Sequence, residues 1–348
     1  MLANPSSSNP RLASDIEITP LVTASSLLSA WAEFLELDVA AGASAPDTAD
    51  TYRRQLRLFV SWCDRADPQI NLASATKDDI KRYRRWLVED RKLKPATVAL
   101  KLSVVRRFYD AAETKGLMRV NPALSVKPPR EKRDAAEKVT YLEKSEVEKL
   151  LAAIKSDGSV KALRDKALLA IMALEGPRTV EMHRANIADL VQQGNNLGIR
   201  VEGKGSIRIV PLTPDIALAL MNYLEARKAI EVLAPSSPLF VAVGYRAGGR
   251  RISRRGIRKV VDGYLKEAGL KHSPGRTIST HSLRHTAGTL ALRAGAELRQ
   301  VQDLLGHKDP RTTSIYTHVA ERWTNNPALK LGITIGPRSG RYIYQDLQ

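Results

Sequence analysis

Apolar and polar residues recur with a helical period through the first third of the chain. Thr76 and Asp79 match a capping box, with Asp in place of the usual Glu or Gln, and predict a helix start. Another helix is expected after Pro95 and is expected to end at Gly116. The stretch 52–63 shows the period most clearly, because its apolar residues share one helix face: Tyr52, Leu56, Phe59, Val60 and Cys63.

The helical pattern breaks at residues 126–140, where two prolines and many charges predict a linker. Helical spacing resumes beyond it, at a capping box formed by Ser145 and Glu148. A strand period then appears on both sides of Gly203-Lys204-Gly205-Ser206, which predicts a β-hairpin with a glycine-rich tip. The short apolar run 239–243 is expected to form a strand or an extended link.

The two ends of the chain differ from its middle. Residues 1–22 are rich in Ser, Pro and Asn without an amphipathic period, and we expect a flexible arm there. The tail has a strand period, because apolar residues alternate strictly at Leu329, Leu331, Ile333 and Ile335. Between the hairpin and the tail, helices are expected from about Ser253, Thr280, Glu297 and Asp309.

These patterns predict a mainly α protein with a small β-sheet, of the α+β class. A length of 348 residues makes two domains the default expectation. The expected parts are the arm at 1–22, an all-α domain at 23–125, the linker at 126–140, a mixed α/β domain at 141–320 and the tail at 321–348.

The charge balance points to a polyanionic partner. The chain has 55 Lys and Arg against 37 Asp and Glu, a net charge of +18, and a pI of about 10.0. No run approaches the roughly 18 apolar residues of a membrane span, and no signal peptide opens the chain. Cys63 is the single cysteine, so the chain has no internal disulfide, which suits a reducing cytosol.

Candidate chemistry begins at the end of an apolar helix and at the hairpin. Arg178 follows Gly176-Pro177, where a functional side chain can be held rigidly, and Glu181 lies one turn on. The alternative is an ordinary surface ion pair of little energetic value. Lys204 lies between two glycines and could place an ammonium group against a phosphate, but a solvated lysine is frequent in such turns, so this signal is weak by itself.

A second group of candidates lies between residues 281 and 316. His281 and Arg284 share one helix face, and Thr280 can cap that helix, where free N–H groups favour an anion. A planar guanidinium suits two phosphate oxygens at once. His307 and Tyr316 follow, and a phenol is a poor nucleophile unless cations stabilise its anion. Each of these residues taken alone could be structural.

Taken together, the motifs are diagnostic. Arg178 with Glu181, Lys204 on a hairpin, the His-x-x-Arg of residues 281–284, the Leu-Gly-His of residues 305–307 and Tyr316 resemble the tyrosine recombinase (phage integrase) family. The order and spacing match over residues 140–320, and the helical half resembles the core-binding domain of that family. The tail resembles the terminal strand of lambda-type integrases rather than an exchanged helix.

The resemblance implies a role for each residue. Tyr316 would be the nucleophile, Arg178 and Arg284 would clamp the non-bridging phosphate oxygens, and Lys204 would protonate the departing 5′-oxygen. His281 would assist the proton transfer and His307 would hydrogen-bond the phosphate. Glu181 would brace the site, and His285 would be a neighbour of less defined role.

A basic surface is expected to contact DNA, largely through phosphates. Residues 245–259 contain seven basic residues and no acid, which favours DNA contact over a merely solvated face. The expected contacts lie on the polar side of the helix at residues 52–63, on the linker, and around the start of the helix at Ser253. They are Arg53, Arg54, Arg57, Lys127, Arg130, Arg250, Arg251, Arg254, Arg255 and Arg258.

The family resemblance implies site-specific DNA recombination through a 3′-phosphotyrosine intermediate and a Holliday junction. The expected partners are double-stranded DNA with specific sites, a homotetramer on two sites that is monomeric or weakly dimeric when free, and an accessory DNA-bending or directionality protein. No cofactor, metal or membrane is expected, and the expected location is the cytoplasm, with the nucleoid. The alternatives are a type IB topoisomerase or telomere resolvase, a catalytically silent DNA-binding relative, and a metal-dependent nuclease.

Overall fold

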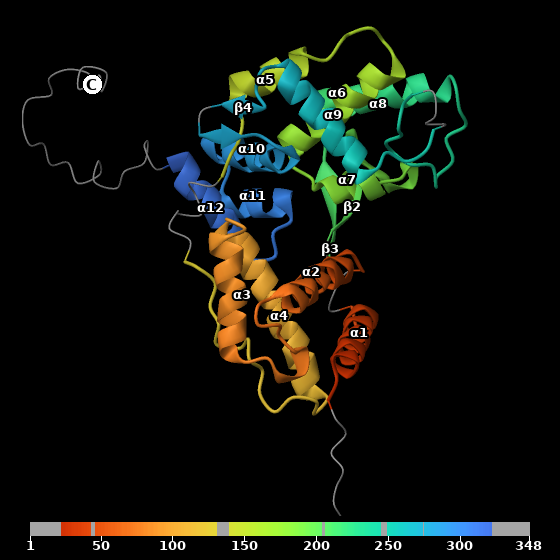
Figure 1. The fold of residues 1–348 in the computed structure, drawn as a ribbon. Helices are drawn as coiled ribbons and strands as arrows, with labels where there is room; N and C mark the ends of the chain where they lie inside the picture. The colour runs from red at the N-terminus through yellow and green to blue at the C-terminus, as the bar shows by residue number, and fades with distance from the viewer. Residues whose placement is uncertain are drawn as a thin grey trace, which may run out of the picture. The chain divides into compact units, whose positions relative to one another are not determined.

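The computed structural model describes residues 22–42, 46–130, 139–203, 206–244, 249–273 and 275–321 (Figure 1). The chain divides into two compact units, unit 1 at Met1–Lys132 and unit 2 at Arg133–Gln348. Both are mainly helical, and unit 2 carries a small antiparallel sheet, so the predicted fold class is confirmed. Three predicted features lie outside the described residues, wholly or in large part. They are residues 1–21 of the expected arm at 1–22, Lys204, and residues 322–348 of the tail.

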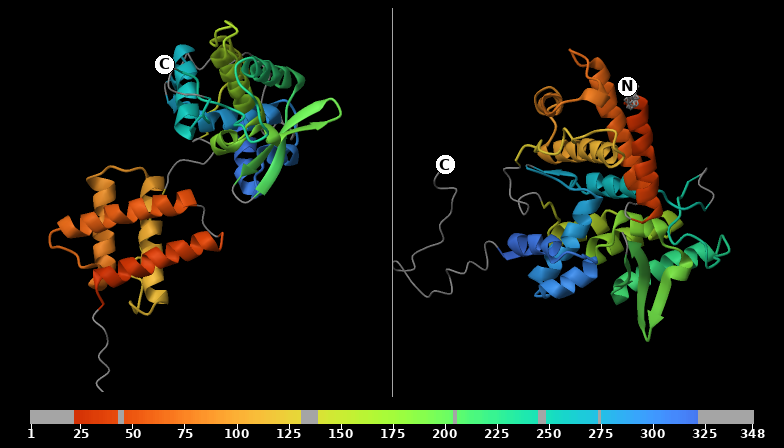
Figure 2. Two further views of the ribbon diagram at one scale, coloured as in Figure 1. Left: turned by 90° about the vertical axis from the view of Figure 1, so that its right-hand side faces the viewer. Right: turned by 90° about the horizontal axis from the view of Figure 1, so that it is seen from below.

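Unit 1 is a bundle of crossing helices. Two of its helices lie across the other two (Figure 2). A short 3₁₀ turn at Leu72–Ser74 precedes the second pair. The helices are α1 (Ala24–Ala40), α2 (Pro46–Arg65), α3 (Lys77–Glu89) and α4 (Pro95–Thr114).

The sequence signals of unit 1 are found where they were predicted. Thr76 caps α3, since its backbone N–H donates to Asp79 Oδ2 at 2.9 Å and its hydroxyl oxygen accepts from the Asp79 N–H at 3.3 Å. Pro95 opens α4, where its missing N–H costs nothing. Gly116 follows the end of α4 with a φ of +69°, a conformation that glycine adopts without strain.

The core of unit 1 is aromatic. Phe59 and Tyr83 meet edge to face with ring centroids 4.9 Å apart, and Trp62 and Tyr83 are equally close. The apolar face predicted for residues 52–63 therefore does pack inward. Cys63 is fully buried within this core, and burial raises the pKa of its thiol to about 12, so it acts as a small apolar residue.

Unit 2 is built mainly of helices and carries its small sheet at one side (Figure 2). A π-helical turn at Ile171–Glu175 and a 3₁₀ turn at Ile187–Asp189 interrupt the α-helices. The helices are α5 (Lys144–Ala152), α6 (Val160–Ala170), α7 (Thr179–Arg184), α8 (Pro214–Lys228), α9 (Arg254–Glu267), α10 (Thr280–Arg293), α11 (Leu298–Leu305) and α12 (Pro310–Glu321).

Two predicted helix caps of unit 2 were wrong by one or two residues. α5 begins at Lys144, because the Glu143 N–H donates to Glu146 Oε2 at 2.9 Å and this pair replaces the predicted Ser145–Glu148 box. Ser279 rather than Thr280 caps α10, since its N–H donates to Ser282 Oγ at 3.0 Å. Residue 281 still lies in the first turn of α10. The starts after residues 253, 297 and 309 agree with prediction.

The sheet is an antiparallel meander of β1 (Leu190–Gln193), β2 (Asn196–Gly203) and β3 (Ser206–Pro211). The predicted hairpin is present as β2 and β3, with Gly203 opposite Ser206. We did not predict β1, because half of its four residues are glutamines, nor the two-residue strands β4 (His272–Ser273) and β5 (Arg276–Thr277). The run 239–243 is an extended link that forms one bridge through Val241 to Arg251.

The segment between the units packs onto both of them at its described ends. Val126 is buried in the core of unit 1. Val139 packs against a cluster of unit 2, and the Thr140 and Ser282 hydroxyls lie 2.8 Å apart. In the described parts of the chain, no helix is long and apolar enough to cross a membrane.

Candidate active site

The helix end before Arg178 is shaped by a close approach of three elements. After the π-helical turn, Gly176 adopts a φ of +63°. A Cβ at this position would lie 2.7 Å from Leu305 Cδ2 and 2.9 Å from Ala287 Cβ, so only glycine fits. α10 and α11 therefore approach the chain directly before Arg178.

Arg178 is bound to a buried carboxylate. Its backbone N–H donates to Glu181 Oε2 at 2.7 Å, and its Nη1 donates to Glu181 Oε1 at 2.8 Å. The Glu181 side chain is fully buried, whereas the Arg178 side chain is 33% exposed. A surface ion pair, the alternative left open by the sequence, is therefore excluded. Arg178 keeps an open side toward solvent while its other side is fixed.

Arg284 is buried at the centre of the site. Its Nη1 donates to the Gly176 carbonyl at 2.6 Å, and its Nη2 donates to the Leu305 carbonyl at 2.5 Å. Desolvation, followed by the charge of Arg178, lowers the pKa of Arg284 to about 10. The guanidinium therefore remains charged at neutral pH and is held in one orientation by the ends of two other elements.

Arg208 belongs to the same cluster, and the sequence did not single it out. It projects from β3 and donates from both Nη1 and Nη2 to Glu181 Oε2, at 3.2 Å each. The signal was present, because Arg208 alternates with Ile207 and Ile209 and so lies on the same strand face as the buried Val210. Desolvation lowers the pKa of Arg208 below its usual value, even though the nearby Glu181 carboxylate raises it.

His281 and His285 lie one turn apart on α10, with ring centroids 4.5 Å apart. Desolvation and the charges of Arg284 and Arg178 lower the pKa of His281. Desolvation, followed by His281 and Arg284, lowers the pKa of His285 to about 4. At neutral pH the His285 ring is therefore uncharged.

Tyr316 projects from α12 into a small cluster of apolar residues and is only 2% exposed. Its ring lies against Gly288, where an added Cβ would be 3.2 Å from Tyr316 Cε2. Its hydroxyl lies 2.9 Å from His285 Nδ1, and a neutral ring protonated at Nε2 accepts that hydrogen bond. Desolvation raises the pKa of Tyr316, while Arg284 and Arg178 lower it.

His307 closes the site on the side of α11 and α12. Its ring stacks on the Tyr316 ring, with centroids 6.1 Å apart, and its Nδ1 lies 2.9 Å from Thr313 Oγ1. Desolvation, followed by the charges of Arg284 and Arg178, lowers the pKa of His307 to about 4. A neutral His307 can thus donate a hydrogen bond without adding charge.

The structure thus brings together seven of the predicted residues of unit 2, and one of them is the phenol of Tyr316. Fixed guanidinium groups and neutral imidazoles suit a phosphodiester, whose single negative charge and developing transition-state charge they can balance. Among the described residues no group of His, Cys, Asp and Glu could hold a metal ion. The clustered residues are Arg178, Glu181, His281, Arg284, His285 and His307, around Tyr316.

The expected DNA-contacting residues are mostly exposed, with one correction. Arg251 was expected to contact DNA, but its Nη1 donates to the carbonyls of His183, Arg184 and Ala185, at 2.8 to 3.0 Å. It therefore caps the end of α7, where a cation is favoured. Arg53 is exposed but pairs with Asp50 at 3.0 Å. The remaining candidates are exposed: Arg54, Arg57, Lys127, Arg130, Arg250, Arg254, Arg255 and Arg258.

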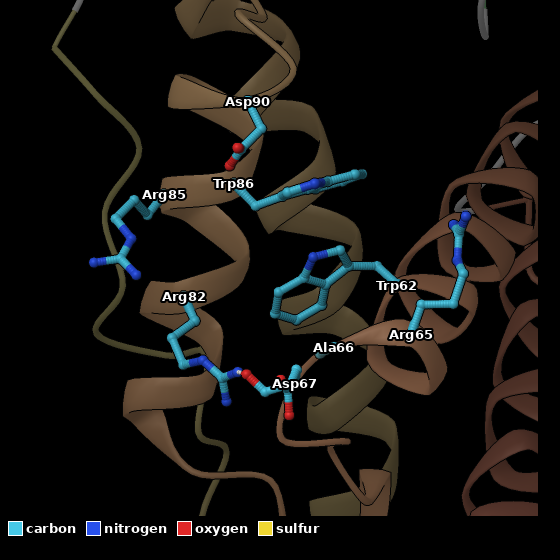
Figure 3. Close-up of a pocket in the computed structure, with 8 residues that line it drawn as sticks. All are labelled: Trp62, Arg65, Ala66, Asp67, Arg82, Arg85, Trp86 and Asp90. Carbon is cyan, nitrogen blue, oxygen red and sulfur yellow. Dashed lines mark hydrogen bonds between the residues drawn. The ribbon is translucent and has the colours of Figure 1, made fainter.

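The described residues also line hollows away from Tyr316. One in unit 1, of about 360 Å³, has the rings of Trp62 and Trp86 on its wall (Figure 3). Arg82 at its edge already donates to the Asp67 carbonyl at 2.6 Å. This hollow lies in unit 1, whereas Tyr316 lies in unit 2.

Two family models and several curated proteins match this chain. Residues 140–322 match the model of the phage integrase family, and residues 30–116 match that of the phage integrase N-terminal SAM-like domain. The chain is 32% identical over 292 residues to tyrosine recombinase XerD of Listeria innocua, covering 83% of this chain and 93% of that protein. It is 31% identical over 304 residues to tyrosine recombinase XerC of Corynebacterium glutamicum, covering 81% and 91%.

Solved structures share the fold at lower identity. XerH site-specific recombinase bound to its difH substrate is 21% identical with a TM-score of 0.65, covering 84% of this chain and 82% of that chain. A lambda integrase tetramer bound to a Holliday junction is 17% identical with a TM-score of 0.63, covering 86% and 79%. The family model matches more than half of the chain, and the two curated relatives match 83% and 81% of it. The chain therefore belongs to the phage integrase family of tyrosine recombinases.

Proposed function

We propose that this tyrosine recombinase cuts and rejoins DNA at specific sites through a covalent bond between Tyr316 and a 3′-phosphate. The observation that carries the proposal is the gathering of two fixed arginines and neutral histidines around the Tyr316 phenol. Oη attacks the phosphorus, the bond to the 5′-oxygen breaks, and a free 5′-hydroxyl results. A 5′-hydroxyl of a partner strand reverses the step, so the bond energy is retained.

The arginines supply the charge for this reaction. The open side of Arg178 and the fixed guanidinium of Arg284 would bind the two non-bridging oxygens. Because both groups are positioned by other parts of the fold, they need little reorganisation as charge develops on the phosphate. The same charges favour the phenolate of Tyr316, as the direction of their effect on its pKa indicates.

The histidines would handle protons and hydrogen bonds. His307, neutral at working pH, would donate to the phosphate, and His281 at the exposed start of α10 would assist removal of the phenol proton. Lys204 would deliver a proton to the departing 5′-oxygen. Since Tyr316 is almost fully buried, its hydroxyl must leave this packing to reach a phosphate of a duplex.

Two strand exchanges through a Holliday junction need four protomers, and we propose a homotetramer on two DNA sites. β3 is an edge strand of the described sheet. It exposes Ile207 and Ile209, at 71% and 57%, beside a hollow of about 410 Å³. The alternating apolar residues of the tail suit pairing with such an edge in a neighbouring protomer.

The tail proposal is tested by size measurement on DNA. Ile209→Lys, or deletion of residues 324–348, should weaken tetramer formation and cleavage. Leu218→Lys is the matched control, because Leu218 is 61% exposed and belongs to α8 rather than to the sheet. Unchanged tetramers and cleavage in the deletion variant would mean that the tail has no such role.

DNA binding itself would come from the exposed arginines of both units. Arg54 and Arg57 of α2 and Arg255 and Arg258 of α9 would contact phosphates, since all four are exposed. Such contacts position the protein and make its affinity fall with salt. A protein of this charge would reside with the nucleoid in the cytoplasm, and an accessory DNA-bending or directionality protein would assist it.

A nicked duplex provides the decisive test of the reaction. Cleavage close to a nick releases a short fragment, so religation fails and the covalent adduct accumulates on a denaturing gel. The duplexes should carry candidate sites from the genetic neighbourhood of the gene. Wild type and the control Tyr141→Phe should form the adduct, and Tyr316→Phe should form none.

The outcomes separate the alternatives. No wild-type adduct on any site, or an adduct that persists in Tyr316→Phe, overturns the proposal. Relaxation of a supercoiled plasmid with a single site, without recombination between two sites, would indicate a type IB topoisomerase. Loss of cleavage on addition of EDTA would indicate a metal-dependent nuclease.

A further inference from the structure

Arg208 lies inside the active-site cluster although the assigned chemistry does not use it. Its neighbours on β3, Ile207 and Ile209, are largely exposed, whereas the Arg208 side chain is only 13% exposed. The alternation of the strand thus turns this one charged side chain inward. A buried guanidinium is costly unless it is paired, so its partners define what it does.

Arg208 reaches its partners over a glycine. Its Nε donates to the Leu304 carbonyl at 3.4 Å, beside Gly306 at the end of α11. A Cβ on Gly306 would lie 2.6 Å from both Cδ and Nε of Arg208. The carbonyl of Gly306 in turn accepts from Arg178 Nη2 at 3.3 Å. The two arginines therefore lie on either side of Gly306 and Glu181.

The two arginines share one carboxylate. Arg178 donates from its side chain to Glu181 Oε1, and Arg208 donates with two nitrogens to Glu181 Oε2. Glu181 is fully buried, so water screens none of its charge. With Arg178 alone, this pair would be neutral. With Arg208 present, the three side chains carry a net charge of +1, which adds to the charge of Arg284.

We infer that Arg208 is a positioning residue of the catalytic centre, which neutralises the buried Glu181 so that the charge of Arg178 is available to the scissile phosphate. The inference rests on the proposed phosphodiester chemistry and deepens it. Arg208 itself faces the carboxylate rather than the open side of Arg178. Its role is therefore electrostatic and acts through Arg178.

The first test measures charge stabilisation directly. Arg208→Met should slow single-turnover cleavage of the nicked duplex about 10- to 100-fold, the range for loss of a group that orients a charge-binding ligand. Replacing the scissile phosphate with an uncharged methylphosphonate should shrink that loss to a few-fold. Arg200→Met, an exposed position on the neighbouring β2, controls for loss of general positive charge.

The second test is a charge rescue. Adding Glu181→Gln to Arg208→Met removes the carboxylate that would otherwise neutralise Arg178, and should restore at least several-fold of the lost rate. Arg208→Lys keeps the charge with one donor group and should lie between wild type and Arg208→Met. It also serves if the methionine variant does not fold, which calorimetry would reveal.

A third measurement does not require cleavage. Binding of inorganic phosphate, followed by ³¹P NMR, should weaken about tenfold in Arg208→Met and in Arg178→Met, but not in Arg200→Met. The absence of a wild-type adduct would overturn the proposed function and leave this measurement informative. Folded Arg208→Met with wild-type phosphate binding, or an equal rate loss on phosphate and methylphosphonate, would overturn the role of Arg208.

Discussion

Gly306→Ala should destabilise unit 2 more than a substitution at an ordinary left-handed glycine. Gly306 has a φ of +64°, and an alanine there loses about 1 kcal/mol through backbone strain. The new Cβ would also lie 2.6 Å from Arg208 Cδ and displace that side chain. Loss of its bonds to the charged Glu181 costs about another 2 kcal/mol.

Gly269→Ala is a closely matched control. Gly269 follows the end of α9 with a φ of +68°, and an added Cβ there would meet nothing within 4 Å. It should therefore lose only the strain, about 1 kcal/mol. In calorimetry the transition of unit 2 should fall by about 2–4 °C in Gly269→Ala and by about 6–12 °C in Gly306→Ala.

The transition of unit 1 provides an internal reference, because neither substitution touches it. Gly306→Ala should also lower cleavage to the level of Arg208→Met, while Gly269→Ala should not. Equal shifts in the two glycine variants would refute the reasoning, since they would mean that Arg208 is not packed over Gly306.

Three further predictions concern the charges of unit 2. The pKa values of His285 and His307 are held at about 4, against 6.5 for an unperturbed histidine, so the unfolded chain binds more protons between these values. The free energy of unfolding should therefore fall as pH drops from about 6.5 to 4, by at most about 1.4 kcal/mol per pH unit for each histidine. A calorimetric stability that does not change with pH in this window would contradict this prediction. Arg255→Ala should reduce the salt slope of DNA binding by about 0.9 without affecting the melting temperature, as fluorescence titration at several salt concentrations would show. Arg251→Met should instead lower the free energy of unfolding by about 2 kcal/mol, because the α7 cap is lost, and should leave the salt slope of DNA binding unchanged. A changed salt slope would mean that Arg251 does contact DNA.

The sequence predicted the architecture because local signals agree with the final fold. The apolar face of residues 52–63, the Thr76–Asp79 box and the hairpin around Gly203 each depend on neighbours close in the chain. The errors also have local causes. The predicted box at Ser145 failed because Glu146, which also pairs with the distant Arg276, reaches back to the Glu143 N–H. β1 is short and half polar, so its pairing with β2 decides its structure.

The sequence indicated part of the chemistry of the site. Spacing on one helix placed His281 and Arg284 together, and the joint occurrence of the motifs predicted that Tyr316 is the nucleophile. Charge alone could not separate Arg251 from Arg255, because both occur in one basic run. Only the carbonyl groups of α7 distinguish the structural arginine from the exposed one.

The sequence by itself determined the fold class and the family, and it predicted the residue types proposed to carry the reaction, since these depend on periodicity and on motifs within short stretches. The tertiary structure decided how they act together. It placed Arg208, Arg178 and Glu181 in one charge network across more than twenty residues, and it buried the Tyr316 phenol against His285. Burial and long-range pairing set the pKa values and the net charge of this cluster, and neither can be predicted from residues that are distant along the chain.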